Sequence, residues 1–165
     1  MRFHLIDRID ACEPGRALRA TKLLALGEEY LADHFPKCPV MPGVLMLQAV
    51  VEAASWLWRA TTDYRHPVVV LREVKSVKYG TFMLPRRRMD VSVELTKQDG
   101  DTAVFRGKGT SDAGQQTVAT QFVLRGYGLA ARGPAGVAAD AKLLEHWKAR
   151  WVLLTGGLRS TGSGT

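Results

Sequence analysis

Residues 33–60 read DHFPKCPVMPGVLMLQAVVEAASWLWRA, and the second half of this stretch predicts a long buried helix. Pro42 suits the first turn of a helix, because its missing N–H group has no partner to lose there. The residues that follow, up to about Ala60, are apolar on nearly every face, which is typical of a helix enclosed by its own domain. We therefore predict a buried helix over residues 42–60.

The few polar residues of this helix fall on one side of it. They are Gln48, Glu52, Ser55 and Arg59, and their spacing of four, three and four residues places them in one stripe. Because unpaired polar groups are costly in a protein interior, we expect the stripe to face hydrogen-bonding partners, water or a ligand cavity.

The segments around the helix favour antiparallel strands. Residues 1–26 predict two extended segments around the turn Glu13-Pro14-Gly15, and residues 27–32 predict a short helix. After the long helix we expect strands at 68–71, 74–82, 89–95, 103–110 and 117–125, with hairpin turns at 98–101 and 112–114. One long helix wrapped by an antiparallel sheet is an α+β architecture.

The C-terminal part of the chain has a different composition. Residues 128–139, GLAARGPAGVAA, predict a linker after a domain that covers residues 1–127. From Asp140 to Leu154 the pattern predicts an amphipathic helix, followed by a disordered tail that completes residues 140–165. The apolar stripe of this helix is expected to cap the same domain or a second subunit, and contact with a membrane surface is the alternative. That stripe consists of Leu144, Trp147, Trp151 and Leu154.

Composition indicates an ordinary globular protein. The 165 residues are 46% hydrophobic and 24% charged, and no run of 18 apolar residues predicts a transmembrane helix. The N-terminal residues are charged and do not resemble a signal peptide.

Cys12 and Cys38 form no disulfide framework, so we expect reduced thiols in a cytoplasmic protein. Cys38 follows His34 by four residues without a second ligand pair, so no metal and no cofactor are expected.

The formal net charge of +7 raises the question of an anionic partner. Apart from Arg86-Arg87-Arg88 the basic residues are scattered and form no nucleic-acid-binding motif, so we expect no nucleic acid partner. An acidic protein, or a phosphorylated ligand such as coenzyme A or phosphopantetheine, is equally compatible with a positive surface.

The segment from His34 to Gln48 carries a more specific pattern. It reads His-Phe-Pro, two further residues, Pro, two apolar residues and then Pro-Gly-Val-Leu. This pattern resembles the β-hydroxyacyl-acyl-carrier-protein dehydratases, hydro-lyases of fatty-acid biosynthesis. The resemblance continues through LREVKSVKYGTFMLP at residues 71–85 and covers about residues 1–127. It implies a hotdog fold, in which a curved antiparallel sheet wraps a long central helix.

The chemistry of dehydration explains why these residue types matter. A 3-hydroxyacyl thioester must lose a proton from C2, for which histidine is suited, while the leaving hydroxyl at C3 must gain one. A carboxylic acid kept neutral by an apolar pocket suits the second role, and free N–H groups at a helix start can polarise the thioester carbonyl. The resemblance implies His34 as the base, the Gly43 amide as the carbonyl-binding group and position 48 as the acid.

Position 48 departs from the family pattern, because it holds glutamine. A glutamine amide can donate a hydrogen bond but cannot supply a proton, and losing a general acid costs about 10²–10⁴-fold in rate. Glu52 lies about 6 Å further along the same helix face. Three alternatives follow. In the first, Glu52 supplies the proton, directly or through water. In the second, the chain binds acyl thioesters without turnover or is the passive partner of an active paralogue. In the third, the site performs other hotdog chemistry, chiefly thioester hydrolysis.

The resemblance also implies pocket and surface residues. Val44, Tyr79 and Phe82 are expected at the acyl tunnel, although the two aromatic residues also fit an ordinary core, and Val44 is expected to help pack the sheet. An acidic carrier protein, or a coenzyme A thioester, is the expected partner. Candidate docking residues, which also fit a merely solvated surface, are Arg86, Arg87, Arg88, Arg106 and Lys108.

The family assembles as dimers that join their sheets, and larger homo-oligomers are common. By this resemblance His34 of one subunit would face Gln48 and Glu52 of the other, in a homodimer or a heterodimer. His4, His66 and His146 lack the sequence context of His34, and we expect them to be structural or surface residues.

Overall fold

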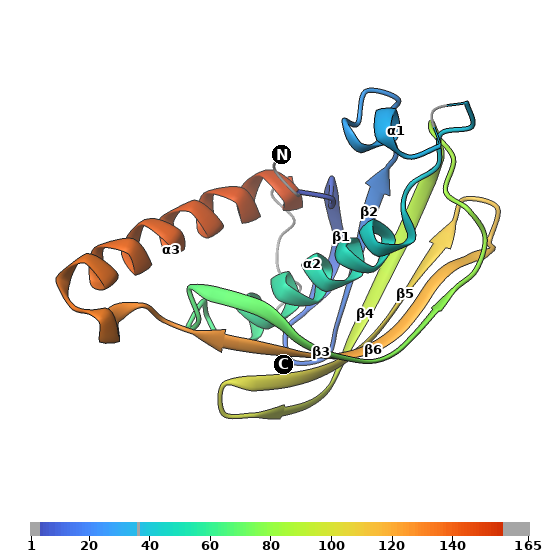
Figure 1. The fold of residues 1–165 in the computed structure, drawn as a ribbon. Helices are drawn as coiled ribbons and strands as arrows, with labels where there is room; N and C mark the ends of the chain where they lie inside the picture. The colour runs from blue at the N-terminus through green and yellow to red at the C-terminus, as the bar shows by residue number, and fades with distance from the viewer. Residues whose placement is uncertain (1–3, 36, 157–165) are drawn as a thin grey trace.

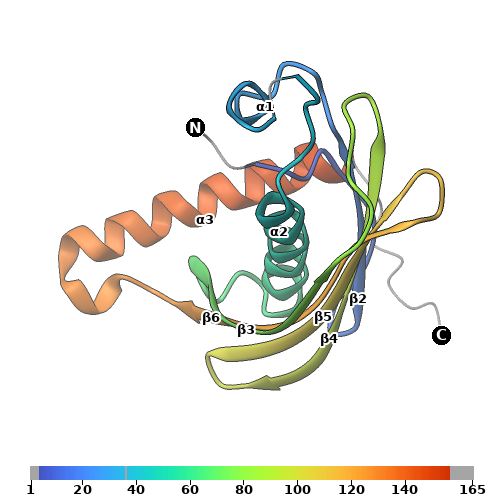
Figure 2. The same ribbon diagram turned by 45° about the vertical axis from the view of Figure 1, so that its right-hand side comes forward.

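A computed structural model of the protein describes residues 4–35 and 37–156. A long helix, α2 (Gly43–Thr61), lies against the inner face of one curved sheet, as Figures 1 and 2 show. The prediction of a helix over residues 42–60 is therefore confirmed, with Pro42 as its N-cap residue. Most of α2 is buried, including both Trp56 and Trp58, as its nearly all-apolar sequence required.

The sheet has six strands, and every pairing in it is antiparallel. Its spatial order is β1-β2-β4-β5-β6-β3, which places β1 and β3 at the two edges. The strands are β1 (Arg8–Glu13), β2 (Ala17–Leu23), β3 (Val68–Tyr79), β4 (Arg88–Asp99), β5 (Thr102–Ser111) and β6 (Gln116–Tyr127). This arrangement of one helix and one antiparallel sheet confirms the predicted α+β hotdog fold.

A glycine in the sheet allows α2 to approach closely. A Cβ atom added to Gly107 of β5 would lie 2.3 Å from Cγ1 of Val50, which is a forbidden separation. Phe105 and Val93 also face α2 and are fully buried. The helix and the sheet therefore form one continuous core around this contact.

Several elements differ from their predicted bounds. The short helix α1 covers Tyr30–Asp33 and not residues 27–32. The two strands predicted at 68–71 and 74–82 form the single strand β3, because register shifts at Leu71/Glu73 and Val74/Ser76 absorb the break in alternation without ending the pairing with β6. The strand ends at Tyr79, so Phe82 lies beyond it.

The C-terminal helix α3 (Pro134–Thr155) begins inside the stretch 128–139 that the sequence predicted as a linker. Pro134 stands in its first turn, which a proline favours, and a short 3-10 helix, η1 (Ala130–Arg132), precedes it. Both ribbon views show α3 alongside α2, and their tryptophans meet: the rings of Trp56 and Trp147 are 5.6 Å apart. The tail predicted to be disordered lies beyond the described residues.

None of the described helices is long and apolar enough to cross a membrane.

Candidate active site

His34 directly follows α1. Its backbone N–H donates to the carbonyl of Tyr30 at 3.1 Å, so the last turn of α1 fixes the point at which the histidine leaves the helix. The imidazole is partly exposed and packs against the Phe35 ring, edge to face, with 4.6 Å between ring centroids. Phe35 itself has a φ of 52°, a left-handed conformation that is uncommon for a non-glycine residue.

The start of α2 lies against the segment that follows β3. The N–H of Met41 donates to the carbonyl of Met83 at 2.9 Å, which joins the two segments. At Gly43 an added Cβ would lie 3.1 Å from Cε1 of Tyr79, so only a residue without a side chain leaves both backbone and ring undisturbed. As the first residue of the helix, Gly43 has an N–H without an acceptor within α2, as a carbonyl-binding amide requires.

An apolar patch surrounds this helix start. It consists of Val44, Tyr79 and Phe82, which are exposed by 66%, 47% and 70%, and Phe35, beside His34, is exposed by 61%. The prediction that Val44 packs the sheet is wrong, because its side chain points outward from the first turn of α2. Large apolar side chains exposed together mark a binding or assembly surface.

The polar stripe of α2 finds several different partners. Ser55 donates to the carbonyl of Val51 within its own helix, at 2.9 Å. The Arg59 guanidinium lies 4.3 Å from the ring centre of Trp147 and 5.5 Å from that of Trp56. Burial lowers the pKa of Arg59 to about 10. Ser55 therefore has a hydrogen-bonding partner and Arg59 has cation–π partners, although Nε of Arg59 is buried without a hydrogen bond among the described residues.

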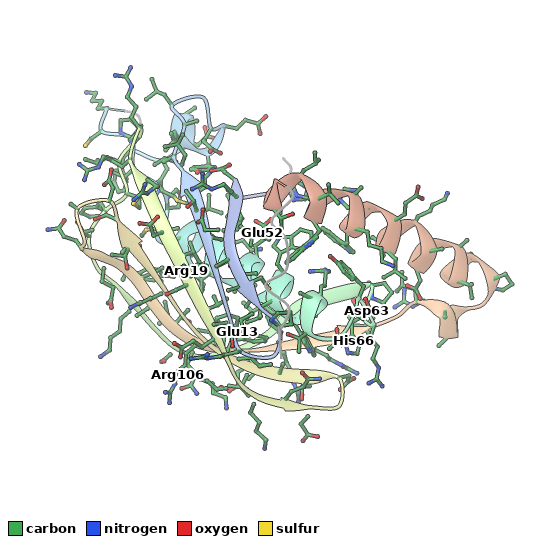
Figure 3. All side chains as sticks on the ribbon, turned by 180° about the vertical axis from the view of Figure 1, so that it is seen from behind. Glu13, Arg19, Glu52, Asp63, His66 and Arg106 are labelled. Atoms are coloured by element: carbon green, nitrogen blue, oxygen red, sulfur yellow. The ribbon has the colours of Figure 1, made fainter. Side chains whose placement is uncertain are left out.

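Glu52 is held by the segment that precedes β1. Its Oε2 accepts the N–H groups of Leu5 at 2.6 Å and Ile6 at 3.2 Å, and its Oε1 lies 3.8 Å from Nδ1 of His4. Its side chain is only 12% exposed. Burial raises the pKa of Glu52, while the two backbone N–H groups and the charge of Arg150 act in the opposite direction. Figure 3 shows Glu52 on α2, close to this segment.

Gln48 differs from the other members of the stripe. Its side chain is partly buried, and it makes no hydrogen bond to any other residue within 4–35 and 37–156. Within the same residues, no hydrogen bond or ion pair joins the side chain of His34 to that of Gln48 or Glu52. Within one chain the structure does not bring the three predicted catalytic residues into contact.

The predicted docking residues separate into two groups. In the first, Arg87 pairs with Asp112 at 2.6 Å and Arg88 with Asp90 at 3.0 Å, so two of its three cations are already neutralised. Arg86 stands beside them in the turn before β4, with a φ of 67°. The second group, Arg106 and Lys108, lies on β5, on the face of the sheet that points away from α2.

Sequence reasoning missed the residues that surround Glu52. His4 and Arg150 come from the two ends of the chain and share no motif with α2, so no sequence signal pointed to them. The rings of His4 and His146 are 6.3 Å apart, which places both histidines near this cluster. Among the described residues, no three His, Cys, Asp or Glu side chains gather closely enough to hold a metal ion.

Comparison with known proteins places this chain in a family. The FabA-like domain matches residues 1–121 of the chain. The 3-hydroxyacyl-acyl-carrier-protein dehydratase FabZ of an Anaeromyxobacter species is 36% identical over 121 residues, which cover 71% of this chain and 75% of the relative. FabZ of Clostridium kluyveri is 30% identical over 117 residues, which cover 71% of this chain and 80% of the relative.

Solved structures share the fold at much lower identity. The dehydratase heterocomplex ApeI:P from Xenorhabdus doucetiae contains a chain with a TM-score of 0.64 and 11% identity, covering 82% of this chain and 88% of that one. A Streptococcus mutans protein bound to acetyl-CoA has a TM-score of 0.58 and 12% identity, covering 77% and 93%. The structural likenesses show the hotdog fold, and the sequence matches show that this chain belongs to the FabA-like family of 3-hydroxyacyl-acyl-carrier-protein dehydratases.

Proposed function

We propose that this chain is a subunit of a 3-hydroxyacyl thioester dehydratase that contributes the base and the thioester-binding amide but no acid of its own. The family supplies the substrate class and the reaction. The arrangement around Gln48 and Glu52 is the reason for proposing that the chain has no acid of its own. The single observation that carries this proposal is that the Glu52 carboxylate is held by the N–H groups of Leu5 and Ile6.

The reaction assigns a task to each residue. His34 would take the C2 proton, the electrons of that C–H bond would form the C2–C3 double bond, and the C3 hydroxyl would leave as water after gaining a proton. The Gly43 N–H would stabilise the negative charge that develops on the thioester oxygen. Gln48 can hold the leaving hydroxyl by a hydrogen bond, but the proton must come from another group.

Glu52 is a poor source of that proton in this arrangement. One of its oxygens already accepts two backbone N–H groups, and the other lies toward His4. Turning the carboxyl away from this segment, toward a substrate beside Gln48, would leave the N–H groups of Leu5 and Ile6 unpaired, at a cost of about 1–3 kcal/mol each. The contacts therefore favour a structural role for Glu52.

A second subunit offers a better source. We propose that the apolar patch around Gly43 is covered by a partner of the same fold, so that His34 meets a carboxylic acid at the partner's position equivalent to 48. The structural neighbour from Xenorhabdus doucetiae is a chain of a dehydratase heterocomplex, and this chain would work in an assembly of that kind. The acyl group would be carried by an acyl carrier protein or by coenzyme A.

One observation favours a second candidate, a homodimeric dehydratase with Glu52 as the acid. Burial raises the pKa of Glu52, which favours the neutral carboxyl that an acid catalyst needs. In that case the wild-type chain would hydrate a crotonyl thioester alone, and Glu52→Gln would stop it.

A complementation experiment tests the proposal. Wild type carries His34 without an acid, and the double variant His34→Ala/Gln48→Glu carries an acid without the base. We expect each protein alone to be inactive in crotonyl-thioester hydration, and co-refolded mixtures to gain activity from sites that combine one residue from each chain.

The matched control is a mixture of wild type with His34→Ala, which has no acid in either chain. Activity of the complementing mixture no greater than that of this control would contradict a site shared between subunits. Release of free thiol in place of hydration would indicate a thioesterase.

A further inference from the structure

The outer face of the sheet, which points away from α2, carries a cavity of about 400 Å³. Strands β3, β4, β5 and β6 line it, with mostly polar or charged side chains. Small residues, Ser92 and Ala119, line it together with the longer basic side chains Lys78, Arg106 and Lys108. Because the whole sheet separates this cavity from α2, it is distinct from the candidate active site.

Strand register shows how the cations of this face are arranged. Arg19 of β2 stands opposite Ser92 of β4, which stands opposite Lys108 of β5. Lys108 stands opposite Ala119 of β6, which stands opposite Lys78 of β3. Directly opposed residues share a face of the sheet, so these five residues form one row across five strands. We call Arg19, Lys108 and Lys78 the basic row.

The row presents its charges at regular intervals. Neighbouring strands lie about 4.8 Å apart, so cations on every second strand are spaced by about 10 Å, over a total of about 19 Å. Ser92 and Ala119 fill the positions between them and leave the row accessible.

The repeat of side chains along one face of an α-helix matches the spacing between the cations of the basic row. Seven residues of a helix advance about 10.5 Å along its axis and return to nearly the same face. Carboxylates at positions i, i+7 and i+14 of a helix laid across the strands would therefore meet the three cations in turn.

The rows on both sides limit what else can bind. Toward one end of the strands the neighbouring row contains Glu94 and Glu13, with Arg106 opposite Glu94. Toward the other end it contains Asp90. Because both neighbouring rows contain carboxylates, the face suits a line of negative charge along the basic row better than a broad polyanion such as a nucleic acid duplex.

The basic row has no acidic partner within the chain. None of the ion pairs among residues 4–35 and 37–156 involves Arg19, Lys78 or Lys108, and all three are exposed. A second copy of this chain does not supply the matching helix: the acidic residues of α3 are Asp140 and Glu145, and Asp140 accepts the N–H groups of Leu129 and Ala130.

We propose that the basic row is the docking surface for an acidic helix of a partner protein, separate from the acyl-thioester site on the other side of the sheet. This inference does not depend on the proposed function, since it concerns binding and needs no turnover. It also accounts for part of the excess positive charge of the chain.

The test uses two synthetic helical peptides of identical composition. The aligned peptide carries glutamates at i, i+7 and i+14, and the shuffled peptide carries the same glutamates on different faces of the helix. Binding to the full-length protein is measured by fluorescence anisotropy. We expect the aligned peptide to bind about tenfold more tightly, because only it can form all three charge pairs at once.

Variants identify the surface. Arg19→Gln/Lys78→Gln/Lys108→Gln should remove the preference for the aligned peptide, while Lys142→Gln on α3 should preserve it. Because all three substitutions are at exposed positions, circular dichroism should show the native fold. As a second measurement, Lys108→Glu should restore binding to a peptide whose central glutamate is replaced by lysine.

Several results would overturn the proposal. They are equal binding of the two peptides, retention of the preference by the triple variant, failure of the charge exchange to restore binding, and absence of binding up to millimolar peptide. Tighter binding of single-stranded RNA than of the aligned peptide would make the surface a nucleic acid site and would also overturn it.

Discussion

Gln48 and the glutamic acid expected at its position differ in one group, because an NH2 group replaces the hydroxyl of the carboxylic acid. Both side chains reach equally far from α2 and both can hydrogen-bond a leaving hydroxyl, but only the acid can protonate it. In this chain α2 begins at Gly43, and His34 directly follows α1. The expected loss of activity is therefore confined to one functional group.

Glu52 gives a pH-dependent prediction at the same scale. Burial raises its pKa in the folded protein, so the folded state holds the proton more tightly than the unfolded chain. The stabilisation from this proton is fully present below the pKa of the unfolded chain and is lost as pH rises through the folded pKa. The difference in unfolding free energy between wild type and Glu52→Gln should therefore decrease from pH 4 toward neutrality, as measured by urea denaturation.

Glu52→Ala separates this charge effect from hydrogen bonding. It leaves the Leu5 and Ile6 N–H groups without their acceptor, so it should destabilise the protein by about 2 kcal/mol relative to Glu52→Gln. A wild-type to glutamine difference that grows with pH would contradict the raised pKa.

At the scale of elements, the sequence identified those whose pattern is local. The all-apolar run after Pro42 predicted α2, and the glycine-containing turns at 98–101 and 112–114 predicted the hairpins of β4, β5 and β6. β3 was split in the prediction because register shifts interrupt its alternation, and only pairing with β6 shows that it is continuous. The start of α3 was missed because Gly and Pro in residues 128–139 resemble a linker, whereas proline is favoured in a first turn.

The partners of the polar stripe were beyond sequence reasoning for a related reason. Glu52 meets residues 46 and 47 positions earlier in the chain, and Arg59 meets Trp147 of α3. Periodicity predicts that a stripe needs partners, but it does not identify groups so distant in sequence.

The packing of α3 on α2 gives a second prediction. Trp147 contacts the Trp56 ring, lies under the Arg59 guanidinium and donates from Nε1 to the carbonyl of Pro67 at 2.9 Å. Trp147→Ala should lower the unfolding free energy by about 3 kcal/mol in chemical denaturation, since it removes all three interactions. The exposed control Lys142→Ala should change it by less than about 0.5 kcal/mol. Equal effects of the two substitutions would mean that α3 does not stabilise the domain.

At the scale of the whole molecule, the chain leaves an open sheet edge beside an apolar patch. β3 pairs with β6 on one side and, within the part of the chain that the structure describes, has no strand on the other; its exposed residues include Val77 and Tyr79. Such an edge is a template for pairing with another chain unless it is covered.

A charge placed in the apolar patch should disrupt assembly. Phe82→Lys puts an ammonium group on a side chain that is 70% exposed in the single chain, and desolvating it in an interface is costly. We expect sedimentation velocity to show monomer for Phe82→Lys and dimer or larger species for wild type. Leu153→Lys, at an equally exposed position on α3, should leave the assembly unchanged, and the same change in both variants would contradict an interface at the patch.

The measurement that tests the central claim most directly is hydration of a crotonyl thioester by purified wild type and Gln48→Glu. The account predicts no turnover by wild type alone and a gain of at least about 100-fold in Gln48→Glu, because one carboxylic acid would complete an otherwise intact site. Wild-type turnover that is lost in Glu52→Gln and not improved in Gln48→Glu would contradict it and would place the acid at Glu52.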